Sequence, residues 1–94
     1  MKIGTIGTGN IVTWVMTEAM RTEGVEYRAV CSRKEESGRA LAGRFGVQKV
    51  YTDLDAMLAD ETIDLIYVAS PNSLHYTHTK AALESGKHVI CEKP

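Results

Sequence analysis

The chain has 94 residues, of which 44% are hydrophobic and 24% charged, a composition that suits one small globular domain. Its 11 basic and 12 acidic side chains leave a formal net charge of -1, so we expect neither nucleic acid nor an anionic membrane as its main partner. No apolar stretch approaches the ~20 residues that span a bilayer, and no signal peptide precedes the first strand-like run. We therefore expect a cytoplasmic protein.

Apolar runs alternate with segments of helical periodicity along the whole chain. The apolar runs predict strands over residues 2–6, 27–31, 49–51, 64–69 and 88–91. Between them, the spacing of apolar side chains predicts helices over residues 10–23, 35–45, 52–58 and 73–86, the third with Thr52 as its N-cap. Gly38 and Gly43 fall inside the second helix and weaken that prediction.

The predicted order of strands and helices indicates the class of fold. The fourth run is continuously apolar from Leu65 to Ala69, which is typical of a parallel strand that helices cover on both faces. Each crossover is long enough to join parallel strands, and right-handed crossovers place helices on both sides of the sheet. The sequence therefore predicts a doubly wound α/β domain, a mostly parallel Rossmann sheet, over residues 1–94.

A glycine turn follows the first predicted strand and precedes the first helix. It reads GTGNIV over residues 7–12, so Gly7 and Gly9 match the first two glycines of G-x-G-x-x-G, and Val12 stands at the third. The first glycine permits the tight turn, and the second lets the backbone approach a pyrophosphate at the helix N-terminus. Alone, this motif also fits a glycine turn that binds another ligand or none.

The end of the second strand indicates which nicotinamide cofactor is preferred. NAD enzymes of this fold carry an Asp or Glu there for the ribose hydroxyls, whereas this chain reads Ser32-Arg33-Lys34. Ser32 can donate to a 2′-phosphate, and Arg33 can pair with it or stack on the adenine. We therefore favour NADP over NAD as cofactor, with a solvated basic helix start as the alternative interpretation.

The last third of the chain carries two further motifs: PNSLH at residues 71–75, after the fourth strand, and GKHVICEKP at residues 86–94, around the fifth. Together with the glycine turn, they resemble the glucose–fructose oxidoreductase / inositol dehydrogenase / rhizopine-catabolism (Gfo/Idh/MocA) family, and the resemblance spans nearly the whole chain. Members of that family pair a Rossmann domain with a larger α/β domain, and they oxidise or reduce carbons of sugars, inositols and related polyols.

The resemblance implies roles for individual residues. It assigns Lys93 to proton transfer or hydroxyl polarisation beside the nicotinamide and the substrate, and it places Glu92 near the nicotinamide ribose. It implies that Thr8, Gly9, Asn10 and Ile11 hold the pyrophosphate and that Ser70, Pro71, Asn72 and His75 line the cofactor cleft. Elementary topology agrees, because these segments follow strand C-termini, which meet at one edge of a parallel sheet.

The histidines bear on metal binding, and the cysteines bear on burial and redox state. His75 and His78 are three residues apart, but no third ligand lies at a suitable spacing, so we expect no metal and a packing role for His78. Cys31 and Cys91 each end an apolar run outside any C-x-x-C pair, so we expect two buried, reduced thiols on strands.

Two other functions compete with the oxidoreductase. A non-catalytic nucleotide-binding regulatory module would keep the fold without the lysine, and a methyltransferase-like domain would keep an acidic residue after the second strand.

The family's substrate domain lies outside these residues, so we expect an incomplete dinucleotide-binding domain that is inactive by itself. Because the predicted strand at residues 88–91 would be left with an open edge, we also expect self-association into a homo-oligomer.

Overall fold

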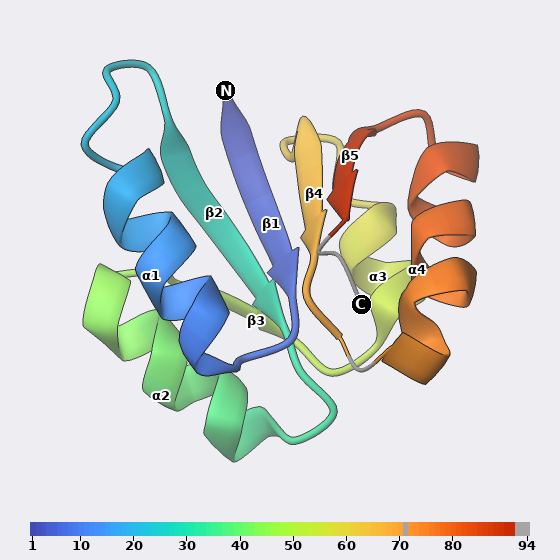
Figure 1. Ribbon diagram of the computed structural model, residues 1–94, viewed down its shortest axis with the longest axis horizontal. Coiled ribbons are helices and arrows are strands. Elements are labelled where there is room, and N and C mark those ends of the chain that lie inside the picture. The colour runs from blue at the N-terminus through green and yellow to red at the C-terminus, as the bar shows by residue number, and fades with distance from the viewer. Residues whose placement is uncertain (71, 92–94) are drawn as a thin grey trace.

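Five parallel strands form one sheet in the order β3-β2-β1-β4-β5 (Figure 1). The computed structural model describes residues 1–70 and 72–91. The strands are β1 (Lys2–Ile6), β2 (Glu26–Cys31), β3 (Lys49–Tyr51), β4 (Leu65–Val68) and β5 (His88–Cys91). The predicted doubly wound α/β class is confirmed, because the first strand lies at the centre of the sheet. The chain adds β2 and β3 on one side of β1 and then β4 and β5 on the other, so the strand order reverses between β1 and β4.

Two pairs of helices cover the two faces of the sheet (Figure 1). The helices are α1 (Asn10–Ala19), α2 (Glu35–Phe45), α3 (Leu54–Leu58) and α4 (Asn72–Glu84). Apolar side chains of α1 and α2 pack in one core cluster, with Val12, Met16 and Leu41 buried there. Side chains of α3 and α4, with Met57 and Ala82 buried, pack in a second cluster on the opposite face.

Two helix ends differ from the sequence prediction. The first helix was expected to reach residue 23, but its regular part ends at Ala19 and continues as tight turns, in which Thr22 N donates to Ala19 O. The N-cap of α3 is Asp53 rather than Thr52, because the Asp53 carboxylate accepts a hydrogen bond from Asp55 N at 3.0 Å. A carboxylate satisfies a free N–H group and also favours the positive end of the helix.

A close helix–sheet approach explains one of the two glycines inside α2. A Cβ atom at Gly38 would lie 2.8 Å from Val50 Cγ1 and 3.2 Å from Ser32 Cβ, so a larger residue would push the helix off β2 and β3. Gly43, in contrast, would place its Cβ atom in open space. The helix therefore forms despite its glycines, and Gly38 lets α2 sit directly against the end of β2.

The outer edge formed by β5 is much more exposed than the centre of the sheet. All four residues of β4 are buried, whereas β5 stands last in the strand order, pairs with β4, and leaves Ile90 54% exposed. Cys31 is buried as expected, but the expectation for Cys91 is wrong, since Cys91 lies exposed on this edge strand.

Over residues 1–70 and 72–91, no helix is both long enough and apolar enough to cross a bilayer.

Candidate functional site

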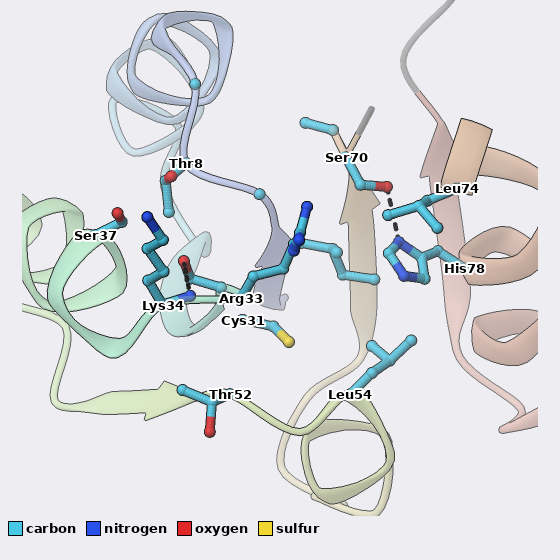
Figure 2. Close-up of a pocket in the computed structure, with 15 residues that line it drawn as sticks. Thr8, Cys31, Arg33, Lys34, Ser37, Thr52, Leu54, Ser70, Leu74 and His78 are labelled. Atoms are coloured by element: carbon cyan, nitrogen blue, oxygen red, sulfur yellow. Dashed lines mark hydrogen bonds between the residues drawn. The ribbon is translucent and has the colours of Figure 1, made fainter. Parts of the chain in front are cut away.

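A cleft of about 710 Å³ opens where β1, β2 and β4 end (Figure 2). The reversal of strand order lies between β1 and β4, and crevices at that point are where open α/β sheets bind ligands. The cleft is lined by the last residues of β1 and β2, by the glycine turn, by residues that follow β2, β3 and β4, and by side chains of α2, α3 and α4: Ile6, Gly7, Thr8, Gly9, Cys31, Ser32, Arg33, Lys34, Ser37, Thr52, Leu54, Ala69, Ser70, Leu74 and His78.

Gly7 holds the turn against the neighbouring strand ends. Its φ angle is 103°, a conformation that side chains other than glycine rarely adopt. Its N–H donates to Cys31 O at 2.9 Å, and a Cβ atom there would lie only 2.7 Å from Ala69 O. No side chain therefore fits at this position, and the backbone passes closely between the ends of β2 and β4.

Gly9 leaves the N-terminus of α1 open. Gly9 is the N-cap residue, no side chain caps the helix, and a Cβ atom on Gly9 would meet nothing within 4 Å. The first N–H groups of a helix lack intrahelical acceptors and carry partial positive charge, so an uncapped helix start is suited to an anion. The geometry of residues 7–10 therefore fits a pyrophosphate group, with Asn10 and Ile11 exposed on the first turn of α1.

Val12 replaces the third glycine of the usual motif without opening a gap. Its side chain is completely buried and belongs to the core cluster between α1 and the sheet. In this chain α1 therefore packs on the sheet through an aliphatic side chain at a position where glycine normally allows close backbone contact.

A hydroxyl-rich and basic corner follows β2. Ser32 is buried, its N–H donates to Tyr51 O at 2.9 Å, and its hydroxyl accepts from Lys34 N at 3.4 Å. Arg33 and Lys34 are exposed, and neither forms an ion pair with a carboxylate in the described part of the chain. Figure 2 shows Lys34 extending toward Ser37 and Thr8. This corner therefore offers two unpaired cations beside hydroxyl groups, a combination that suits phosphate.

Sequence reasoning missed three residues of this corner, namely Lys34, Ser37 and Thr52. Lys34 and Ser37 could have been found from their position close after the predicted Ser32-Arg33 pair. Lys34 directly precedes α2, and Ser37 lies in its first turn. Thr52 follows β3, whose pairing with β2 brings it to the same edge. The sequence instead predicts Thr52 as the N-cap of a helix.

The other side of the cleft is built by the residues that follow β4 and by α3 and α4. The Ser70 hydroxyl and His78 Nδ1 share a hydrogen bond of 2.7 Å, and Ser70 is buried. Burial, and secondarily the nearby His75, lowers the pKa of His78, so its imidazole is neutral at neutral pH. Leu54 and Leu74 are half-buried cleft residues near this pair (Figure 2). This side therefore combines apolar walls with one polar pair.

His78 and His75 are placed differently from the sequence expectation. The sequence predicts a packing role for His78. In the structure His78 lines the cleft, one turn of α4 after Leu74. His75 lies outside this cleft and instead lines a second hollow with Tyr76, Thr79, Lys80, Leu83, Glu84 and Cys91. The structure thus brings His78 rather than His75 to the same cleft as Ser70.

Several expected site residues are not placed by the structure. Pro71, Glu92 and Lys93 lie outside the described residues, and Asn72 is described only as the first residue of α4. In residues 1–70 and 72–91, no group of three or more His, Cys, Asp or Glu side chains is arranged to hold a metal ion. Cys31 lines the cleft, but burial and then the Asp53 carboxylate raise its pKa to about 11, so this thiol is protonated at neutral pH.

Comparisons with known proteins agree with this geometry. A family model described as an oxidoreductase family with an NAD-binding Rossmann fold matches residues 1–94. The D-xylose 1-dehydrogenase (NADP(+)) 2 of Haloferax volcanii is 36% identical over 94 residues, which are all of this chain and 29% of that protein.

Two solved structures show the same fold over the whole chain. GenD2 from gentamicin A biosynthesis, in complex with NAD, has a TM-score of 0.94 at 32% identity, and the match covers 27% of its chain. The scyllo-inositol dehydrogenase from Lactobacillus casei, with bound NAD(H) and scyllo-inositol, has a TM-score of 0.89 at 30% identity, and the match covers 28% of its chain. The chain therefore spans less than a third of the length of each of these proteins.

Proposed function

The chain belongs to the oxidoreductase family with an NAD-binding Rossmann fold, and from this membership we propose that residues 1–94 are the dinucleotide-binding domain of an NAD(P)-dependent oxidoreductase. The observation that carries the proposal is the uncapped start of α1, at Gly9, in a cleft at the reversal of strand order. A pyrophosphate there would accept hydrogen bonds from backbone N–H groups, which needs no side chain from the turn.

The binding groups divide along the cleft by chemistry. Residues Gly7, Thr8, Gly9, Asn10 and Ile11 would hold the pyrophosphate, and Ser32 and Arg33 would hold the adenosine ribose. The unpaired charges of Arg33 and Lys34 support a preference for NADP, because a 2′-phosphate adds negative charge at that corner. Relatives with NADP in their name and structures with NAD both occur, so the corner's own chemistry carries this preference.

The activity proposed for the whole protein is hydride transfer between a nicotinamide ring and a carbon of a sugar, inositol or related polyol. The relatives named for xylose and scyllo-inositol support this class of small-molecule substrate. The nicotinamide supplies the hydride acceptor or donor when bound. Lys93 would take or give the hydroxyl proton, with Glu92 near the nicotinamide ribose, and Ser70, Pro71 and Asn72 would support the cofactor from the β4 side, whereas His75 lines the second hollow and would not contact the cofactor.

Titration of the chain with NADP, NAD and S-adenosylmethionine tests the binding proposal. We expect calorimetric binding of both dinucleotides, tighter for NADP, and no binding of S-adenosylmethionine. A folded chain that binds neither dinucleotide would contradict the proposal, and binding of S-adenosylmethionine alone would favour a methyltransferase-like domain.

Arg33→Ala tests the preference for NADP, with Arg44→Ala as its matched control. Both arginines are exposed, but Arg44 lies in the last turn of α2 and does not line the cleft. Because a charge-assisted hydrogen bond contributes about 1.5–3 kcal/mol, we expect Arg33→Ala to weaken NADP binding at least tenfold and NAD binding much less. An unchanged ratio of the two dissociation constants would refute the assignment of Arg33.

The role of Lys93 is tested in the whole protein by Lys93→Met, with the exposed Lys80→Met as control. Loss of a proton-transfer group typically lowers kcat by about 10²–10⁴-fold, and the dissociation constant for NADP should change little. Full activity of the Lys93 variant on sugars and inositols would exclude that role. It would favour a different proton-transfer residue, whereas a parent protein that binds NADP but oxidises or reduces no substrate would favour the regulatory module.

Assembly and location are also proposals. The open edge of β5, with Ile90 exposed, supports self-association into a homo-oligomer, which light scattering of the chain would test. A chain that stays monomeric at high concentration would count against it. The reduced Cys31 thiol is compatible with a cytoplasmic protein, which fractionation would test.

A further inference from the structure

We propose that His78, held in place by Ser70, contacts the adenine base of the dinucleotide; this rests on the proposed function of the cleft. The ring extends from α4 toward the end of β4, with Ser70 on one side and Leu54 beyond it (Figure 2). The hydrogen bond between the Ser70 hydroxyl and Nδ1, at 2.7 Å, fixes the ring and leaves its other edge, with Cε1 and Nε2, on the cleft side.

The position of the base follows from two other parts of the dinucleotide, the pyrophosphate and the ribose, for which the cleft has proposed binding groups. The start of α1 takes the pyrophosphate, and the corner after β2 takes the ribose. The base must then continue from the ribose into the part of the cleft that Leu54, Leu74 and His78 line. A purine has apolar faces and a polar edge, and this part of the cleft has aliphatic side chains with one polar pair.

The hydrogen-bonding capacity of His78 matches a purine edge. Burial lowers the pKa of the imidazole, so it carries a single N–H at neutral pH. When the Ser70 hydroxyl donates to Nδ1, the proton is on Nε2 and that atom is a donor; in the other tautomer Nε2 is an acceptor. Adenine offers both an acceptor nitrogen and an amino donor, so either tautomer has a partner on the base.

A purely structural role is the competing explanation, since the same bond ties α4 to the end of β4. The two explanations differ in what a ligand does to the ring. If His78 contacts the base, adenosine monophosphate alone should perturb the imidazole, and nicotinamide mononucleotide should not. If the bond is only structural, neither mononucleotide should affect the ring differently from its neighbours.

The experiment is a nuclear magnetic resonance titration of the chain, following the ring C–H signals of its three histidines. Adenosine monophosphate and nicotinamide mononucleotide are added separately, and His75→Gln and His78→Gln identify the signals. His75 is the internal control, because it lies one turn earlier on α4 and lines the second hollow. We expect adenosine monophosphate to shift the His78 signals and to leave those of His75 nearly unchanged.

Affinity measurements give an independent readout. Because one hydrogen bond contributes about 1 kcal/mol, His78→Leu should weaken binding of adenosine monophosphate about fivefold, whereas His75→Leu should not. If His78→Leu does not fold, by circular dichroism, the titration of the unmodified chain decides alone.

The outcomes separate this inference from the proposed function. Binding of NADP with no shift of the His78 signals by adenosine monophosphate would overturn the role of His78 and leave dinucleotide binding intact. Failure of the chain to bind NADP, NAD or either mononucleotide would overturn the proposed function itself.

Discussion

The two ends of the parallel sheet use their polar groups in opposite ways. Where β4 and β5 begin, the Asp60 carboxylate accepts hydrogen bonds from Lys49 Nζ at 2.9 Å, from Tyr51 OH at 2.8 Å, and from the backbone and hydroxyl of Thr62. Lys87 Nζ closes the same region by donating to Asp60 O at 2.8 Å and to Ile63 O at 2.9 Å. Every charge in this cluster has a partner.

Where β1, β2 and β4 end, the groups are left open instead. The start of α1 has no side-chain cap, and Arg33 and Lys34 lack a carboxylate partner among the described residues. The paired end therefore stabilises the fold, whereas the open end keeps groups that are free to form hydrogen bonds and ion pairs. Substitutions of the charged side chains at the two ends should therefore separate stability from binding.

The largest effect is expected at the glycine turn, where Gly7→Ala and Gly9→Ala form a matched pair. Gly7 combines a φ of 103° with a Cβ position 2.7 Å from Ala69 O, so Gly7→Ala should destabilise the chain by about 3 kcal/mol or more. For a domain of this size, that loss lowers Tm by more than ~10 °C, measurable by circular dichroism.

Gly9→Ala should do the reverse. Its φ of -67° suits any residue and its Cβ atom meets nothing, so Tm should stay within a few degrees of the parent. The added methyl group occupies the approach to the helix start, so the affinity for NADP should fall at least ~10-fold. Unchanged affinity in Gly9→Ala would show that the pyrophosphate does not lie at this turn.

The next largest effect is expected at the paired end, from Asp60→Asn. Hydrogen bonds to a charged group contribute about 1.5–3 kcal/mol, so the free energy of unfolding should fall by about 2 kcal/mol in urea titration. Glu61→Gln is the control, because Glu61 is the exposed neighbour in the same loop. The dissociation constant for NADP should stay unchanged in both, since the cluster lies away from the cleft.

Acid should reveal the same cluster without mutation. Hydrogen bonds from Thr62, and then from Lys49, hold the pKa of Asp60 well below its usual range, against the opposing effect of burial. A carboxylate with a lowered folded-state pKa contributes stability above its unfolded value, near ~4, and that contribution is lost as the pH falls toward the folded value. Between pH 6 and pH 3 (about two units above and one unit below ~4), the parent should therefore lose more stability than Asp60→Asn, and equal losses would contradict this assignment.

The two ends also differ in how far sequence reasoning could describe them. The alternation of strands and helices, the cleft edge and the glycine turn follow from periodicity and topology, because the C-termini of parallel strands must meet at one edge. The Ser70–His78 bond could not be predicted, since residues eight apart meet only once α4 is docked against β4. The hydrogen bonds of the Asp60 cluster could not be predicted either, because its partners come from β3, the loop before β4 and the residue before β5.

The smallest effects should come from the two glycines of α2, and they test whether packing reaches the cleft. Gly43→Ala puts a methyl group in open space within a helix, so it should stabilise the chain by about 0.5–1 kcal/mol. Gly38→Ala gains the same propensity, but its Cβ atom would lie 2.8 Å from Val50 Cγ1 and 3.2 Å from Ser32 Cβ. The overlap should outweigh the gain and give a net loss of about 1–2 kcal/mol.

Because Ser32 lines the corner after β2, the displaced contact should also weaken NADP binding in Gly38→Ala and not in Gly43→Ala. If both variants are stabilised and bind NADP equally well, the close approach of α2 to β2 does not shape this corner.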